Sequence, residues 1–272
     1  MIVAGFVLLA VGAADLVRQF AARRWIGFLV VVILLLALGS ASDAVLPMLA
    51  GLAVGALWIW SMPDQRPAPA GFWPAVVLAL VSVIAVVTVG DRDSAGLIGN
   101  VWHLRSPVGE VSFDLAILVL GAALFLLESA NLVVRTALDG EHTWRPVDRT
   151  PVPEHGSRAD GDSERHLSDS AAGAASDPDP DPDAPAVPDR RGAFQGGRLI
   201  GPLERILVLM LTLAAAYPIL AAMLAAKGIV RFPEISRGRE TGARAEYFLV
   251  GSLVSWVIAL GAAFLVWWAA NS

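Results

Sequence analysis

Long apolar stretches separated by short polar ones dominate this chain. A helix needs about 20 mostly apolar residues to cross the roughly 30 Å of a bilayer's hydrocarbon core. Seven stretches fit, and they run from Ile2 to Val17, Trp25 to Gly39, Ala44 to Trp60, Phe72 to Gly90, Phe113 to Val134, Leu199 to Ala226 and Tyr247 to Trp268. The pattern predicts an all-α, polytopic integral membrane protein with about seven transmembrane helices, within a range of six to eight.

Tryptophan positions support these boundaries. Indole rings favour the headgroup level of a membrane, because the ring is apolar and its N–H is a donor. Six of the nine tryptophans lie at the ends of predicted helices: Trp25, Trp58, Trp60, Trp73, Trp267 and Trp268. We therefore expect these side chains at the membrane surface.

Residues 138–197 break the apolar pattern. Thirteen acidic residues and seven arginines lie between Leu138 and Arg198, and Asp alternates with Pro from Asp177 to Asp183. Proline removes backbone donors and like charges repel, so a long disordered loop is predicted. The chain thus divides into a five-helix block (1–137), an acidic linker (138–197) and a two-helix block (198–272). The linker is either a solvated tether or a docking segment for a protein partner.

Composition narrows the functional classes. Hydrophobic residues make up 56% of the chain and charged residues 17%, against about 25% charged in soluble domains. The chain has no cysteine, which excludes disulfides and thiolate metal ligands. No metalloprotease, P-loop or nucleophile-elbow motif occurs, and no basic stripe favours nucleic acid. We expect a lipid bilayer as the environment, with no catalytic residue, metal or cofactor.

Basic residues give an ambiguous orientation. With the N-terminus outside, the positive-inside rule counts ten Lys and Arg near helix ends inside and seven outside, and it places the acidic linker in the cytoplasm. The conflict comes from the basic loop after the sixth stretch. A helix broken at Pro218 and folded back would bring that loop inside, whereas a single crossing would leave it outside.

Two groups of polar residues lie within apolar stretches, where charges are expensive. Asp15 and Arg18 are three residues apart, so they can pair on one helical face at the interface. Glu128 and Asn131 have the same spacing deep in the fifth stretch. Glu128 either faces a cavity or pairs with a cation from another helix. A carboxylate in such a place could carry protons or bind a cation, and the alternative is a structural buried hydrogen bond.

A second set of charges lies near the ends of the last two apolar stretches. Adjacent helical residues point about 100° apart, so Glu204 and Arg205 are expected to find different partners. Lys227 is the only lysine of the chain. We predict a polar cluster of Glu204, Arg205, Lys227, Arg231 and Glu246.

Small residues indicate where helices pack closely in lipid. Gly51 and Gly55 form a G-x-x-x-G pair in the third stretch. Gly251, Ser255, Ala259 and Ala263 recur every four residues in the last one. Packing within one chain is the favoured interpretation and dimerisation the alternative, so the oligomeric state stays open.

The C-terminal third contains three motifs: GPLER at 201–205, AAKGIVRF at 225–232 and AEYFLVGSL at 245–253. In their sequences and their order they resemble an uncharacterised family of bacterial multi-pass membrane proteins. Ser252 stands where threonine is usual. The resemblance covers about residues 197–268. It implies a bacterial cytoplasmic membrane location and no established activity.

Three functional hypotheses follow. The first is a non-enzymatic scaffold or regulatory membrane component. The second is a small transporter or channel component that uses Glu128. The third, a membrane-embedded enzyme, is the least favoured because no catalytic constellation is visible.

Overall fold

The protein is described here by a computed structural model that covers residues 1–62, 71–89, 92, 96–99, 101–106, 109–140, 197–236 and 241–272. Side chains are not described for residues 105–106, 139–140, 197–198, 230–236 and 241–247. The predicted acidic linker lies outside the described residues except at its two ends. The described residues of the two apolar blocks belong to one compact unit, so the blocks pack together.

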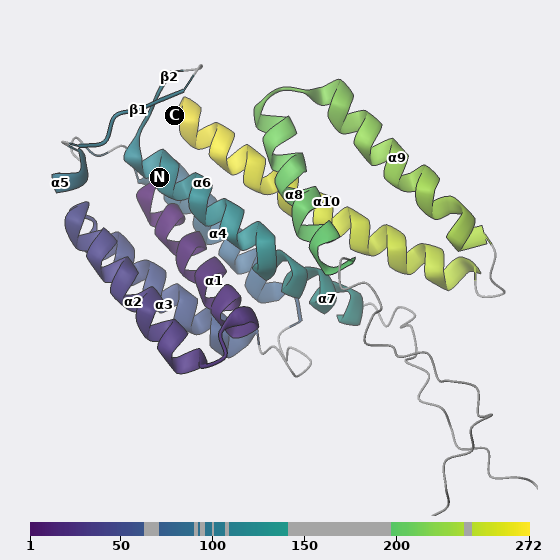
Figure 1. The fold of residues 1–272 in the computed structure, drawn as a ribbon, viewed down its shortest axis with the longest axis horizontal. Coiled ribbons are helices and arrows are strands. Elements are labelled where there is room, and N and C mark those ends of the chain that lie inside the picture. Colours follow the sequence, from purple (N-terminus) through teal and green to yellow (C-terminus); the bar gives the residue numbers. More distant parts are fainter. Residues whose placement is uncertain are drawn as a thin grey trace, which may run out of the picture. The chain divides into compact units, whose positions relative to one another are not determined.

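Helices account for almost all of the described chain (Figure 1). They are α1 (Ile2–Phe20), α2 (Arg24–Ala41), α3 (Val45–Ser61), α4 (Trp73–Thr88), α5 (Gly96–Gly99), α6 (Phe113–Leu124), the π-helical turn η1 (Phe125–Ser129), α7 (Ala130–Gly140), α8 (Gly197–Leu213), α9 (Tyr217–Ser236) and α10 (Thr241–Asn271). One short antiparallel hairpin, β1 (Leu104–Ser106) and β2 (Gly109–Val111), adds to the predicted all-α fold.

Four helical segments are long and apolar enough to cross a membrane. They are α1, α2, the continuous run from Phe113 to Leu138, and Phe248–Asn271 of α10. Three further apolar helices are shorter: α3, α4 and Tyr217–Ile229 of α9. By length and composition, therefore, part of the predicted set of seven spans is found.

Helix α1 lies at the centre of the N-terminal helices, and its neighbours approach it through glycines. A Cβ built at Gly12 would lie 2.7 Å from the backbone of Leu124 and Phe125, and one built at Gly51 would lie 2.7 Å from the carbonyl oxygen of Phe6. Only glycine allows backbones this close. Helix α1 runs parallel to α3 and α6, because residues later in α1 contact residues later in each of these two helices.

Two pairs of helices are joined by the same type of turn. After α2, Ala44 N donates to Gly39 O and Asp43 N to Ser40 O, with Asp43 at φ 52°. This is a Schellman motif, which normally has glycine at the left-handed position.

Between α8 and α9 the corresponding bonds run from Ala216 N to Leu211 O and from Ala215 N to Thr212 O, with Ala215 at φ 52°. The sixth apolar stretch is therefore two helices, and the break lies just before Pro218. Because Lys227 of α9 contacts Glu204 of α8, α9 folds back along α8.

Candidate functional site

A π-helical turn in the fifth apolar stretch is the local feature around which buried polar groups gather. η1 interrupts the run from α6 to α7, and the N–H of Ala130 bonds to Phe125 O five residues earlier. The wider turn disturbs the regular ladder of hydrogen bonds, and such turns recur at functional sites. Here the carbonyl of Leu126 accepts a bond from a side chain of another helix, the Arg205 guanidinium.

Arg205 joins three elements of the fold. Its guanidinium is buried, with 4% of the residue exposed. Nε donates to Ser255 Oγ of α10 at 2.9 Å, and Nη1 donates to Asn131 Oδ1 of α7 at 2.7 Å and to Leu126 O of η1 at 3.3 Å. A buried guanidinium requires such acceptors. Arg205 therefore fastens α8 to both the N-terminal helices and α10.

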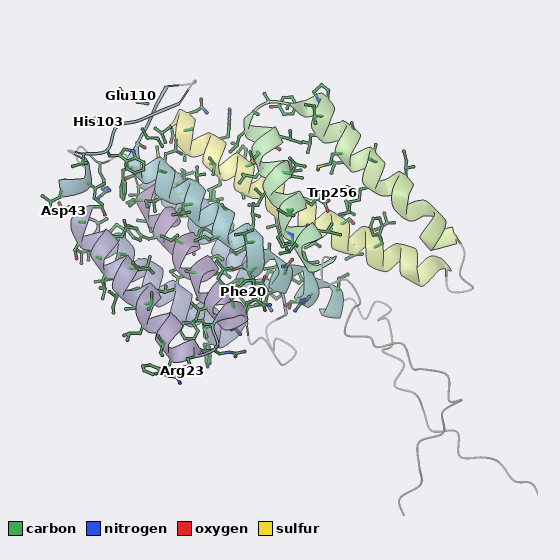
Figure 2. All side chains as sticks on the ribbon, in the orientation of Figure 1. Phe20, Arg23, Asp43, His103, Glu110 and Trp256 are labelled. Carbon is green, nitrogen blue, oxygen red and sulfur yellow. The ribbon has the colours of Figure 1, made fainter. Side chains whose placement is uncertain are left out.

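Its neighbour Glu204 joins a different set of helices. Both of its oxygens lie 2.7 Å from Lys227 Nζ of α9, and Trp256 Nε1 of α10 donates to Oε1 at 2.8 Å. The Lys227 ammonium also lies 5.4 Å from the Trp256 ring centroid and 5.8 Å from that of Phe248. Figure 2 shows Trp256 where α8 meets α10. The adjacent pair Glu204 and Arg205 thus has separate partners, as their angular separation predicts.

A third group lies on α1, on the other side of η1. Asp15 is 5% exposed. It accepts from Arg18 Nη1 at 3.1 Å and from Trp58 Nε1 at 2.8 Å, and Arg18 Nη2 donates to Met62 O at 2.8 Å. The predicted pairing of Asp15 with Arg18 is present. Trp58 is buried at 3% exposure against Asp15, so its ring packs between helices and does not face outward.

Glu128 lies between these groups. With Asp15, Arg18 and Arg135 it lines a cavity of about 20 Å³, which is room for about one water molecule. Asn131 Nδ2 lies 3.5 Å from Glu128 Oε2. The buried hydroxyl of Ser129 lies beside the Asp15 carboxyl group. An arginine pair and two carboxylates therefore face one small polar space.

The opposite end of the helices holds an ion pair that the sequence interpretation missed. Arg92 donates from Nε to Asp114 Oδ2 at 3.1 Å and from Nη1 to Ser42 O at 2.9 Å. Ser112 caps α6 by accepting from Leu115 N, and acidic residues such as Asp114 favour the first turn of a helix. This sequence signal marks the start of α6 but does not identify Arg92 as the partner of Asp114. Figure 2 shows Asp43, His103 and Glu110 at this end and Phe20 and Arg23 at the other.

The remaining predicted positions fall into two groups. Arg231 and Glu246 lie in α9 and α10, where their side chains are not described. A Cβ at Gly55 would lie 3.3 Å from that of Ala10, and one at Gly251 would lie 3.5 Å from Leu138. Ala259 and Ala263 are fully buried and Ser255 binds Arg205. The small-residue stripe of α10 thus contacts other helices of the same chain.

No group of three or more histidine or acidic side chains is placed to hold a metal ion within the described part of the chain. Comparison of the chain with protein-family models, curated proteins and solved structures finds no match. Fold and site define a helical protein with four apolar helices of membrane-spanning length and a buried polar network at a π-helical turn.

Proposed function

We propose that the chain is a multi-pass protein of the bacterial cytoplasmic membrane with eight apolar segments in the bilayer. The segments are α1, α2, α3, α4, the run from α6 to α7, α8, α9 and α10. The α8–α9 hairpin supports this topology, because it places the basic loop that follows the sixth apolar stretch on the same side as the acidic linker. Fifteen Lys and Arg near helix ends then lie on that side and two on the other, which removes the conflict in the positive-inside count.

This topology can be tested with single cysteines, because the chain contains none of its own. We expect Arg237→Cys and Arg24→Cys to be protected from a membrane-impermeant thiol reagent in intact cells and labelled after lysis. Ala215→Cys, in the turn of the hairpin, should be labelled in intact cells. External labelling at position 237 would contradict the folded-back arrangement.

We further propose that the protein is a non-enzymatic scaffold or regulatory membrane component. The observation that supports this role is the pairing of its buried charges across helices. Arg205 has three acceptors, and Glu204 has two donors from different helices. Because these buried charges have hydrogen-bond partners on several helices, they stabilise one arrangement of the helices. A protein that binds a partner at a fixed surface needs such a rigid arrangement.

The acidic linker is the proposed docking segment for that partner. Deleting residues 141–196 and replacing them with a neutral Gly/Ser linker of equal length should remove co-purifying proteins. The helices should still fold, as judged by an unchanged elution volume in detergent. A linker with scrambled order but the same charge separates sequence recognition from simple charge attraction. If all three forms co-purify with the same proteins, the linker is not the docking site.

A transporter or channel component is the second candidate. It is favoured by the cavity that Glu128 shares with Asp15 next to a π-helical turn. If a cation or proton passes there, Glu128→Gln should abolish a cation-dependent flux in proteoliposomes, whereas Glu110→Gln, in the β-hairpin, should not. Equal flux in both variants and wild type would eliminate Glu128 as a transport residue.

A further inference from the structure

Each of the first four membrane segments proposed above shares a short sequence with one of the last four. RWIGFL at 24–29 begins α2 and RLIGPL at 198–203 lies in the first turns of α8, with four of the six residues identical. LVSVIA at 80–85 of α4 recurs as LVSWVIA at 253–259 of α10, with one tryptophan added. Both matches join segments that are four places apart along the chain.

The other two pairs of segments match in the same order. ADLVR at 14–18 of α1 corresponds to ANLVVR at 130–135 of α7, with one valine added. PMLA at 47–50 of α3 corresponds to PILA at 218–221 of α9. A single match of this length occurs by chance in apolar helices, but four matches in the same order indicate a repeated unit.

Residues at matching positions of α4 and α10 also lie in similar surroundings. Leu80 and Leu253 are 57% and 56% exposed, whereas Ser82 and Ser255 are 2% and 6% exposed. The two segments therefore direct matching residues outward and matching residues against neighbouring helices.

The local structure of α2 agrees with that of α8. A Cβ built at Gly27 would lie 2.5 Å from Val17 Cγ1 of α1, and one built at Gly201 would lie 3.6 Å from Asn131 Oδ1 of α7. Each of these matching glycines thus faces the segment that precedes its own helix. Both helices end in a Schellman turn.

We propose that the chain is a tandem duplication of a four-helix unit. The first copy consists of α1 to α4, and the second consists of the run from α6 to α7 with α8, α9 and α10. An even number of crossings separates matching segments, so both copies cross the membrane in the same direction, and α1 and α6 run parallel where the copies meet. The proposal rests on the eight-segment topology proposed above.

The duplication bears on the second candidate function. Some transporter folds consist of two repeats that cross the membrane in the same direction, with the substrate site at the interface of the repeats. Here the polar cavity lies between the first segments of the two copies, and the matching residues Arg18 and Arg135 line it. Its volume of about 20 Å³, room for about one water molecule, limits a substrate there to a proton or a single small ion and excludes organic solutes.

Matching residues at the ends of segments test whether the two copies cross in the same direction. We expect Asp43→Cys and Ala215→Cys both to react with a membrane-impermeant thiol reagent in intact cells. Arg24→Cys and Arg198→Cys should both be protected until lysis. A matched pair with one member on each side of the membrane would overturn the proposal.

The surroundings of matching residues test whether the copies share one structure. Because the chain contains no cysteine, a single nitroxide label can be attached at each position of 80–85 and 253–259 in turn. Collision of the label with oxygen, measured by electron paramagnetic resonance in liposomes, reports which positions face lipid. We expect the two profiles to coincide when Trp256 is skipped, with at least threefold more collision at the exposed leucines than at the buried serines. The control is the same comparison shifted by one position, which should fit worse.

Profiles that agree no better in register than when shifted would overturn the duplication, because the likeness of the two sequences would then be accidental. A water-soluble nickel chelate keeps this proposal apart from the membrane location. Labels in both segments that collide with the chelate as freely as an unbound nitroxide would contradict the membrane location itself. Labels that are shielded from the chelate but have profiles out of phase contradict the duplication alone.

Discussion

The helices around α1 and the helices α8 to α10 differ in their main contacts, although Asp15 of α1 also accepts a hydrogen bond from Trp58 of α3. In the N-terminal part, α1 meets α6 at Gly12 and α3 at Gly51 so closely that a Cβ has no room. In the C-terminal part, charged side chains connect the helices. Arg205 binds Asn131 and Ser255, and Glu204 binds Lys227.

The difference illustrates the two ways in which helices associate in a bilayer. Lipid tails are as apolar as leucine, so apolar burial contributes little, and close packing of small residues and polar contacts between helices contribute more. Close packing of small residues tolerates no added atom. Polar contacts between helices tolerate changes of side-chain shape but require that each donor and acceptor stays paired. The variants below separate the two.

The largest effect is expected from Gly12→Val. Its Cβ would meet the backbone of Leu124 and Phe125 at 2.7 Å, and backbone atoms inside a helix cannot move aside. The overpacking should lower the free energy of unfolding by about 3 kcal/mol, measured by thermal unfolding in detergent. Gly228→Val is the control, because its Cβ meets no atom. Similar unfolding temperatures for both variants would refute close packing of α1 on α6.

Arg205→Met should have the next largest effect. It leaves Asn131 Oδ1 and Leu126 O without this donor, and a buried group that loses a charged partner costs about 2 kcal/mol. A double-mutant cycle with Ser255→Ala should show a coupling of about 1 kcal/mol. The same cycle with Ser272→Ala, at the exposed C-terminus, should show none. Zero coupling with Ser255 would mean that α8 is not fastened to α10 through this contact.

Lys227→Met should destabilise the protein by about 1 kcal/mol, because ion pairs that are only partly buried contribute little more than this. The Lys227 and Glu204 side chains are 25% and 13% exposed. Methionine keeps the apolar stem against Phe248 and Trp256, so the loss reports the charge. Lys227→Arg should recover most of it. If Lys227→Met lowered stability as much as Arg205→Met does, the difference in burial between Lys227 and Arg205 would not predict their contributions to stability.

The smallest effects are expected in the two Schellman turns, one after α2 and one after α8. Ala215→Gly should stabilise the protein by about 0.5 kcal/mol, because glycine adopts the left-handed conformation without steric penalty. Asp43→Gly should stabilise it less, since aspartate tolerates that conformation better than alanine. The difference in unfolding temperature between the two variants is the measurement. A loss of stability in Ala215→Gly would indicate that the turn does not adopt φ 52°.

Some of the site follows from sequence alone. Asp15 and Arg18 pair because a spacing of three residues on one helix brings side chains together. Glu204 and Arg205 have different partners because adjacent helical residues point apart. Pro218 marked the break in the sixth stretch to within a few residues. The left-handed position is occupied by Ala215, however, and alanine gives no turn signal.

Contacts between distant helices could not be predicted in this way. Trp58 reads as an interfacial residue because it lies at a helix end, yet it donates to Asp15 across 43 positions. The π-helical turn at Phe125–Ser129 contains no glycine or proline, so the sequence does not predict it. Arg92 lies between α4 and α5 and Asp114 lies in α6, and nothing in their spacing connects them.

The sequence by itself determined the apolar segments, their approximate ends and the pairings within one helix, because these depend on bilayer thickness and on the helical repeat. The tertiary structure decided which helices touch, which charge each buried charge meets and that α9 folds back along α8. The physical reason is that lipid sets the length of a helix from outside, whereas the partner of a buried polar group is set by whichever helix brings a matching donor or acceptor within reach.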